Sequence, residues 1–222
     1  MSVVVQIFEG KFAAPEQPQS VRRTSRLSPI HHEQIQSLVQ QLFFQPESGS
    51  VRHAAFSAAD DSINILPLCF EIAEVLSDLD SYDIGVIDAN PHGPPLENKL
   101  GLGPIARAES PRHIRARLWL VPRESWMPAG AARLVTEQDM SRLQALTAKF
   151  DFSILCCPPL SCVTARIGRA CEGVVLVLAA NKTRRLVARE MRDYLRSAQV
   201  PLLGTVLTER RFPVHLGLYR SL

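Results

Sequence analysis

Residues 51–79 constrain the fold more than any other stretch, because they have the pattern of a strand, a loop and a helix in direct succession. We expect the strand at residues 51–57, the loop at residues 58–64 and the helix from about Ile65, where apolar residues recur at helical spacing. A loop of this length between a strand and a helix is where nucleotide-binding proteins hold phosphate. There, backbone N–H groups and the positive end of the helix dipole face the anion.

This loop lacks the residues that a phosphate site uses. Such a site needs glycines, so that the backbone can curl around the anion, followed by a lysine and a serine or threonine for phosphate and magnesium. Residues 58–66, AADDSINIL, contain no glycine, lysine or threonine, and they place Asp60 and Asp61 where an anion would lie. The stretch therefore predicts a fold more firmly than it predicts an activity.

Strands and helices alternate along the rest of the chain. Further strands are expected at residues 82–89, 116–121, 152–156, 173–180 and 201–207. Helices are expected at residues 29–44, 131–149, 161–171 and 183–198. In the second of these Leu134 should face inward, and Ser161 should cap the third. This order predicts an α/β fold with a doubly wound, mostly parallel sheet and helices on both faces.

Ligands of such sheets bind at the carboxyl ends of the strands. The segments expected at this edge are residues 58–64, 89–93, 157–160 and 208–211.

The N-terminal residues differ in composition from the rest of the chain. Residues 1–28 are expected to form an arm and flexible linker, in which residues 3–8 are either a short strand or an arm. The segment that follows is rich in Pro, Gln, Ser and Arg, with few apolar residues to bury. Residues 29–222 are expected to form a single α/β domain, since they suffice for a full core.

The composition argues against several classes of protein. A net charge of +3 is too small to indicate nucleic-acid binding by itself, and no apolar run reaches the length of about 18 residues that a membrane span needs. The N-terminus has no basic region before its apolar run and no small-residue cleavage site, so we expect no signal peptide. The five cysteines are odd in number and lie on apolar elements, which favours a reduced, cytoplasmic chain.

Six motifs occur along the chain in the order in which one known protein family has them. FSAADDSINIL (56–66) aligns without a gap with the phosphate loop of that family, roughly T-S-x-x-x-G-E-G-K-S/T, and VIDANPHGPPLENKLGL (86–102) resembles its second aspartate motif. The other four are LWLVPRESWMPAG (118–130), FDFSILCCPPL (150–160), GVVLVLAANKTRR (173–185) and LLGTVLTERR (202–211). They resemble the strand ending in LPAG, the Walker B stretch, the strand and turn after it, and the strand ending in an adenine-contacting Asn. Together the six motifs resemble the deviant-Walker P-loop family that includes MinD, ParA and the bacterial tyrosine kinases of polysaccharide export. The closest resemblance, over about residues 28–220, is to the cytoplasmic domains of these kinases, and it implies a P-loop NTPase-like fold.

The chemistry of that phosphate loop is altered here. The resemblance places its two glycines on Ser62 and Asn64, its catalytic lysine on Ile65 and its magnesium-binding hydroxyl on Leu66. Loss of the lysine removes the cation that holds the β- and γ-phosphates, and loss of the hydroxyl removes a magnesium ligand. We therefore expect no nucleotide or metal cofactor and no catalytic residue.

Other family positions differ too. The Walker B aspartate falls on Cys156 and the adenine-contacting Asn on Thr208, while the second-motif aspartate is kept as Asp88, with Asn90 in place of its usual partner acid. The degenerate nucleotide site predicted in this way comprises Ser57, Asp61, Ser62, Asn64, Ile65, Leu66, Asp88, Asn90, Cys156 and Thr208.

Two groups of residues have alternative interpretations. Asp88 could hold a metal, or it could be a carboxylate held by backbone N–H groups at a strand end. Cys156, Cys157 and Cys162 could bind zinc, but their spacing matches no common zinc pattern. Burial as small apolar side chains is the favoured account of these cysteines.

The helix expected at residues 183–198 carries the most distinctive surface pattern. Arg185, Arg189, Arg192 and Arg196 are spaced by 4, 3 and 4 residues and therefore share one face. This stripe could bind nucleic acid, anionic lipid or an acidic partner, or it could be a solvated face partly neutralised by neighbouring acids.

The resemblance and its departures together favour a pseudo-enzyme. The hypothesis is an inactive P-loop pseudo-ATPase or pseudo-tyrosine-kinase that acts as a cytoplasmic binding or regulatory subunit in exopolysaccharide or capsule synthesis or export. Its expected partner is a membrane-bound polysaccharide chain-length-control protein or an active kinase paralogue, which would place it peripherally at the inner membrane; a homodimer is a further option. The alternative is a ParA/MinD-like organiser that binds DNA or a membrane surface through the basic helix.

Overall fold

The computed structural model describes residues 3–6, 29–44, 51–79, 81–101, 110–115, 117–127, 134–180 and 182–209. Its strands are β1 (Val3–Gln6), β2 (His53–Ala58), β3 (Ile84–Asp88), β4 (Arg112–Arg115), β5 (Leu118–Val121), β6 (Phe152–Cys156), β7 (Gly173–Ala179) and β8 (Leu202–Thr208). Its helices are α1 (Pro29–Phe43), α2 (Leu66–Leu79), α3 (Leu96–Lys99), α4 (Glu137–Thr147), α5 (Cys162–Ala170) and α6 (Arg185–Ser197), with a 3₁₀ turn, η1 (Arg123–Ser125), after β5.

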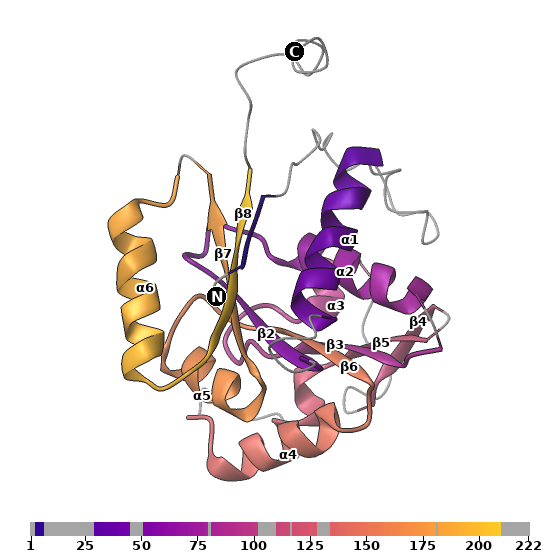
Figure 1. Cartoon of the computed structure of the whole chain (residues 1–222). Helices are drawn as coiled ribbons and strands as arrows, with labels where there is room; N and C mark the ends of the chain where they lie inside the picture. Colours follow the sequence, from indigo (N-terminus) through magenta and orange to yellow (C-terminus); the bar gives the residue numbers. More distant parts are fainter. Residues whose placement is uncertain are drawn as a thin grey trace.

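The strands form one sheet in the order β1-β8-β7-β2-β6-β3-β5-β4 (Figure 1). All neighbouring strands are parallel except β4 and β5. The predicted α/β fold, with a mostly parallel sheet between helices, is therefore confirmed. Phe56 of β2 and Asp88 of β3 are both in register with Cys156 of β6, so the carboxyl ends of these three strands lie side by side.

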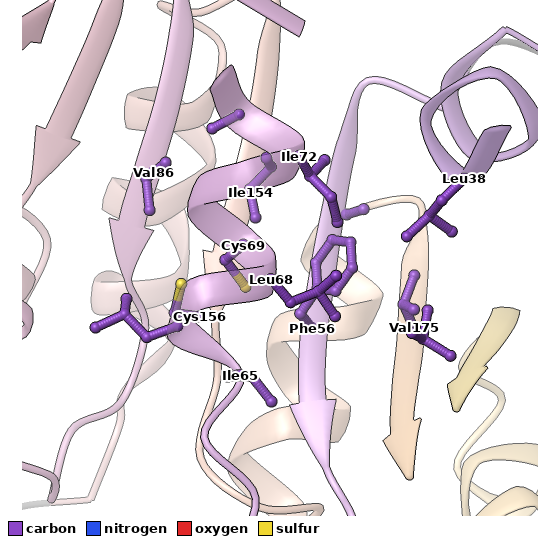
Figure 2. Packing of buried hydrophobic residues seen from close by; sticks show 14 of the residues in the cluster. Leu38, Phe56, Ile65, Leu68, Cys69, Ile72, Val86, Ile154, Cys156 and Val175 are labelled. Atoms are coloured by element: carbon purple, nitrogen blue, oxygen red, sulfur yellow. The ribbon is translucent and has the colours of Figure 1, made fainter. Parts of the chain in front are cut away.

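Two layers of helices cover the sheet because successive side chains of each buried strand point to opposite faces. Phe56, Ile154 and Val175 pack with α1 and α2 on one face (Figure 2). Their chain neighbours Leu155 and Leu176 pack with α4, α5 and α6 on the other. The chain thus builds two separate apolar cores, one on each side of the sheet.

Several elements differ from the prediction: α3 and η1 are short helical segments that were not expected, and β4 and the start of α4 differ as well. β4 was not predicted, because its residues RHIR are polar, and it pairs antiparallel with β5 at the sheet edge. The helix expected from residue 131 begins at Glu137, where Thr136 caps it: the Thr136 hydroxyl accepts from the Asp139 N–H at 3.2 Å, and the Asp139 carboxylate accepts from the Thr136 N–H at 2.9 Å. Leu134 precedes this cap and is 89% exposed, so the prediction that it faces inward is wrong. Ser161 caps α5 as predicted, accepting from the Thr164 N–H at 3.4 Å.

The N-terminal strand β1 pairs in parallel with β8, with Val3 opposite Gly204. Residues 3–8 were expected to be either a short strand or an arm, and residues 3–6 form a strand. The predicted linker up to residue 28 and the chain after residue 209 lie outside the described residues, and the domain boundary at residue 28 stays a prediction. In the described segments, no helix has the length and apolar character needed to cross a membrane.

Candidate functional site

The loop after β2 borders a pocket at the carboxyl edge of the sheet. The pocket has a volume of about 380 Å³ and is lined by Ala58, Asp61, Ile63, Asn64, Ile65, Leu66, Asn90, Pro94, Leu96, Lys99, Cys156, Cys157 and Pro159. Three of the four segments expected at the ligand edge therefore meet here, those at residues 58–64, 89–93 and 157–160. Thr208, from the fourth segment, does not line the pocket: its hydroxyl donates to the Leu178 carbonyl oxygen at 3.2 Å within the sheet.

The loop satisfies its own backbone donors with short polar side chains. The Asp60 carboxylate accepts hydrogen bonds from both the backbone N–H, at 2.8 Å, and the hydroxyl of Ser62. The Asn64 side-chain oxygen accepts from the N–H of Leu66, the first residue of α2, at 3.2 Å. In a phosphate-binding loop such N–H groups face the anion. Here the N–H groups of Ser62 and Leu66 donate instead to the side chains of Asp60 and Asn64.

Three apolar residues of the loop and helix start are buried. Ile63, Ile65 and Leu66 are 7%, 9% and 5% exposed and belong to the core shared with α1 and α2. Figure 2 shows Ile65 at the start of α2, below Leu68 and Cys69. Burial of each such side chain stabilises the fold by about 1.5–3 kcal/mol. The loop is therefore anchored to the core at the positions where the family has its lysine and its magnesium-binding hydroxyl.

Asp88 is fully buried at the end of β3, and both of its carboxylate oxygens accept backbone hydrogen bonds. One accepts from the Asn90 N–H at 3.1 Å and the other from the Leu96 N–H, at the start of α3, at 3.2 Å. Burial raises the pKa of Asp88 to about 6, against the lowering effect of these hydrogen bonds and of the Arg123 charge. This arrangement matches the second interpretation of Asp88, a carboxylate held by backbone N–H groups.

Arg123 holds the loop after β3 through hydrogen bonds to its backbone, a role that was not predicted from the sequence. Its guanidinium donates to the carbonyl oxygens of Asn90, at 3.0 Å, and Gly93, at 2.7 Å. The Asn90 side-chain oxygen accepts from the N–H groups of His92 and Gly93 at 3.2 and 3.0 Å. Asn90 is therefore engaged in a turn. In the sequence, the only hint of this role is that Arg123 directly follows Pro122, the residue after the last residue of β5.

Solved structures share this architecture. The chimerical protein CapA2B2 superposes with a TM-score of 0.68 and 15% identity, over 84% of this chain and 87% of that one. The kinase domain of the Escherichia coli tyrosine kinase ETK gives 0.64 and 17%, over 83% and 79%. A ParA family ATPase from Chlorobium tepidum gives 0.54 and 14%, over 72% and 75%. This chain has their P-loop NTPase-like fold. No family model matches it, and neither does any curated protein.

Of the remaining predicted site residues, Cys156 and Ser57 are buried within this fold, whereas Asp61 is exposed. Cys156, at the Walker B position, is buried beside Cys69 of α2 (Figure 2). The hydroxyl of Ser57 is buried and donates to the Pro158 carbonyl oxygen at 2.8 Å. Asp61 is exposed at the pocket, where Lys99 of α3, a residue sequence reasoning did not single out, supplies a cation. Their assignment to a degenerate nucleotide site stays a prediction.

The three cysteines considered as zinc ligands, Cys156, Cys157 and Cys162, differ in their exposure. Burial raises the pKa of the Cys69 and Cys157 thiols, which favours the neutral form over the thiolate that a metal requires. Cys162 is exposed, whereas Cys156 and Cys157 are buried. Across the described ranges, no group of three or more His, Cys, Asp or Glu side chains is placed to hold a metal ion. Burial of Cys156 and Cys157 agrees with the account of these two as small apolar core residues, whereas the exposure of Cys162 shows that this prediction is wrong for Cys162.

Proposed function

We propose that this protein is a pseudo-ATPase or pseudo-tyrosine-kinase that serves as a cytoplasmic binding or regulatory subunit in exopolysaccharide or capsule synthesis or export. One observation carries the proposal: the side chains of Asp60 and Asn64 accept hydrogen bonds from N–H groups of the loop that a phosphate would otherwise use. The kinase-domain fold supports the context, and the buried Ile65 and Leu66 support the loss of activity.

The donor set does not fit a magnesium nucleotide. Mg²⁺ takes oxygen ligands from carboxylates, hydroxyls and phosphates in octahedral geometry. Here Leu66 and Cys156 offer none, and both oxygens of Asp88 already accept backbone hydrogen bonds. Hydrogen bonds from Ser62 lower the pKa of Asp60, so this carboxylate is ionised at neutral pH and repels a phosphate.

Isothermal calorimetry is expected to detect no binding of ATP or ADP at millimolar nucleotide in the presence of magnesium. The physical reason is that the loop has no lysine, that Leu66 replaces the magnesium-binding hydroxyl, and that the N–H groups of Ser62 and Leu66 already donate to side chains of the loop. An active tyrosine kinase domain of the same fold, measured under the same conditions, is the positive control. Saturation at a Kd below about 1 mM, which corresponds to more than about 4 kcal/mol of binding free energy, would contradict the proposal.

A binding subunit of this kind needs no nucleotide to reach its competent conformation, because its loop is already anchored through Ile63, Ile65 and Leu66. In our proposal the partner is a membrane-bound polysaccharide chain-length-control protein or an active kinase paralogue. The protein would then lie in the cytoplasm, held peripherally at the inner membrane by that partner.

Self-association or partner binding is therefore expected to be constitutive. Size-exclusion chromatography with light scattering should give the same mass with and without ATP and magnesium. The matched control is the same pair of runs on an active relative. A mass that increases only when ATP is present would contradict the pseudo-enzyme reading.

The alternative, a ParA/MinD-like organiser, has one observation in its favour. Arg185, Arg189 and Arg196 of α6 are exposed, and none of them forms an ion pair within the described residues. Binding to random-sequence duplex DNA or to anionic vesicles, with an affinity that falls steeply with salt, would support this alternative.

A further inference from the structure

The sheet face next to α6 is only partly covered. Every position of β3 and β6 is buried, whereas Leu202, Thr205 and Leu207 of β8 are half-buried. Figure 1 shows α6 to one side of β7 and β8. Its inward residues Met191 and Leu195 join the core on this face of the sheet. Within the described segments, the partial burial of these β8 side chains shows that α6 covers the outer part of this face incompletely.

A groove of about 430 Å³ lies between α6 and these strands. Its strand side consists of Leu176, Leu178, Leu202 and Thr205, and its helix side consists of Arg185, Ala188, Arg189 and Arg192. The volume is within the range of about 300–1,000 Å³ that is typical of ligand sites. Three of the four arginines in the predicted stripe therefore border a groove whose floor is mainly apolar. The fourth, Arg196, does not line the groove.

The helix side of the groove carries net positive charge. Arg192 is neutralised by Asp193, whose carboxylate accepts from it at 2.8 Å. Arg185 and Arg189, one helical turn apart, have no ion pair among the described residues and are exposed. Guanidinium groups pair with carboxylates through two parallel hydrogen bonds. The surface thus combines two available guanidinium groups with leucine side chains.

We propose that this groove binds an acidic, amphipathic segment of a second protein. The carboxylates of the segment pair with Arg185 and Arg189, and its apolar side chains pack on Leu178 and Leu202. This inference rests on the proposed role as a binding subunit and specifies the surface and the chemistry of the partner.

Charge argues against a segment of this chain as the occupant. Residues 210–222 contain three arginines and no acidic residue, and residues 7–28 contain four basic residues and two acidic ones. The same repulsion disfavours the basic segments of a second copy. A nucleic acid would pair its phosphates with the arginines but would leave the leucine floor without an apolar contact. An acidic, amphipathic protein segment can pair its carboxylates with the arginines and pack its apolar side chains on the leucines.

The test uses a synthetic amphipathic peptide of glutamate and leucine at helical spacing, with a peptide that has lysine in place of glutamate as its control. Fluorescence anisotropy should show binding of the acidic peptide to the full chain, and no binding of the basic one. Arg185→Glu combined with Arg189→Glu should weaken binding at least about tenfold, because two charge-assisted contacts become repulsive. The matched control, Arg52→Glu combined with Arg169→Glu, changes the net charge equally at exposed positions away from the groove and should bind like the wild type.

Thr205→Arg separates a groove from a merely basic surface. This change fills the floor while adding positive charge, so it should weaken the acidic peptide, whereas duplex DNA or an anionic vesicle would bind the same variant more tightly. Unchanged melting temperatures establish that each variant is folded. The proposal is overturned if the reversal variant binds the peptide as tightly as the wild type does, or if Thr205→Arg strengthens peptide binding. Failure of these peptide tests leaves the nucleotide measurements unaffected, so it is distinguishable from failure of the pseudo-enzyme proposal.

Discussion

Replacement of Trp126 by alanine is expected to lower the free energy of unfolding by about 3–5 kcal/mol. Trp126 is fully buried in the core formed with α4, and it is one of the largest such side chains. Its indole N–H also donates to the Asp88 carbonyl oxygen at 2.8 Å. The change therefore leaves a cavity and an unpaired carbonyl at the end of β3. Urea denaturation followed by circular dichroism measures the loss.

Trp126→Phe separates these two contributions. Phenylalanine keeps most of the aromatic packing but has no N–H, so the buried Asp88 carbonyl loses its donor at a cost of about 1–3 kcal/mol. We expect this variant to lie between the wild type and the alanine variant in stability. A loss of less than about 1 kcal/mol for Trp126→Ala would contradict the packing described here.

Asp88 by itself is expected to lower the free energy of unfolding of the wild type by up to about 3 kcal/mol as the pH rises from about 4 to about 7. Burial raises the pKa of Asp88 from 3.8 to about 6 in the folded protein. The folded state therefore binds this proton more tightly than the unfolded state does. The resulting stabilisation is fully present below the unfolded pKa and is lost as the pH rises through the folded pKa.

Asp88→Asn should remove this part of the pH dependence, because asparagine does not ionise in this range. The difference in unfolding free energy between the wild type and Asp88→Asn, measured by urea denaturation at several pH values, isolates the effect. Asp193→Asn, on the exposed side of α6, is the control and should keep the wild-type slope. Equal slopes for the wild type and Asp88→Asn would contradict the assignment.

The same experiment addresses the other interpretation of Asp88, that it holds a metal. A bound divalent cation favours the ionised carboxylate, so magnesium would stabilise the protein at neutral pH and would weaken the pH dependence. Because the Asp88 carboxylate already accepts hydrogen bonds from the backbone N–H groups of Asn90 and Leu96, we expect magnesium to change neither the stability at neutral pH nor its pH dependence.

The order of strands and helices, and hence the fold class, followed from the sequence because its signals are local. Apolar residues at period 2 or 3.6 reveal the elements, and their strict alternation leaves few arrangements besides a parallel sheet. The altered phosphate loop was equally visible, since the absence of glycine and lysine from residues 58–66 needs no structure to be seen. The start of α4 was misplaced because a cap at Thr136 competes with a helical pattern that extends further back.

Only the tertiary structure decided which distant residues complete each site. Arg123 reaches carbonyl oxygens 30 and 33 residues away, and Trp126 donates to a carbonyl 38 residues away. The groove beside α6 exists because β8 lies near the edge of the sheet, where one helix covers its face incompletely. A helical pattern shows that Arg185 and Arg189 share a face, but what lies opposite them depends on strand order and packing. Those contacts join residues far apart in the chain, so no local pattern encodes them.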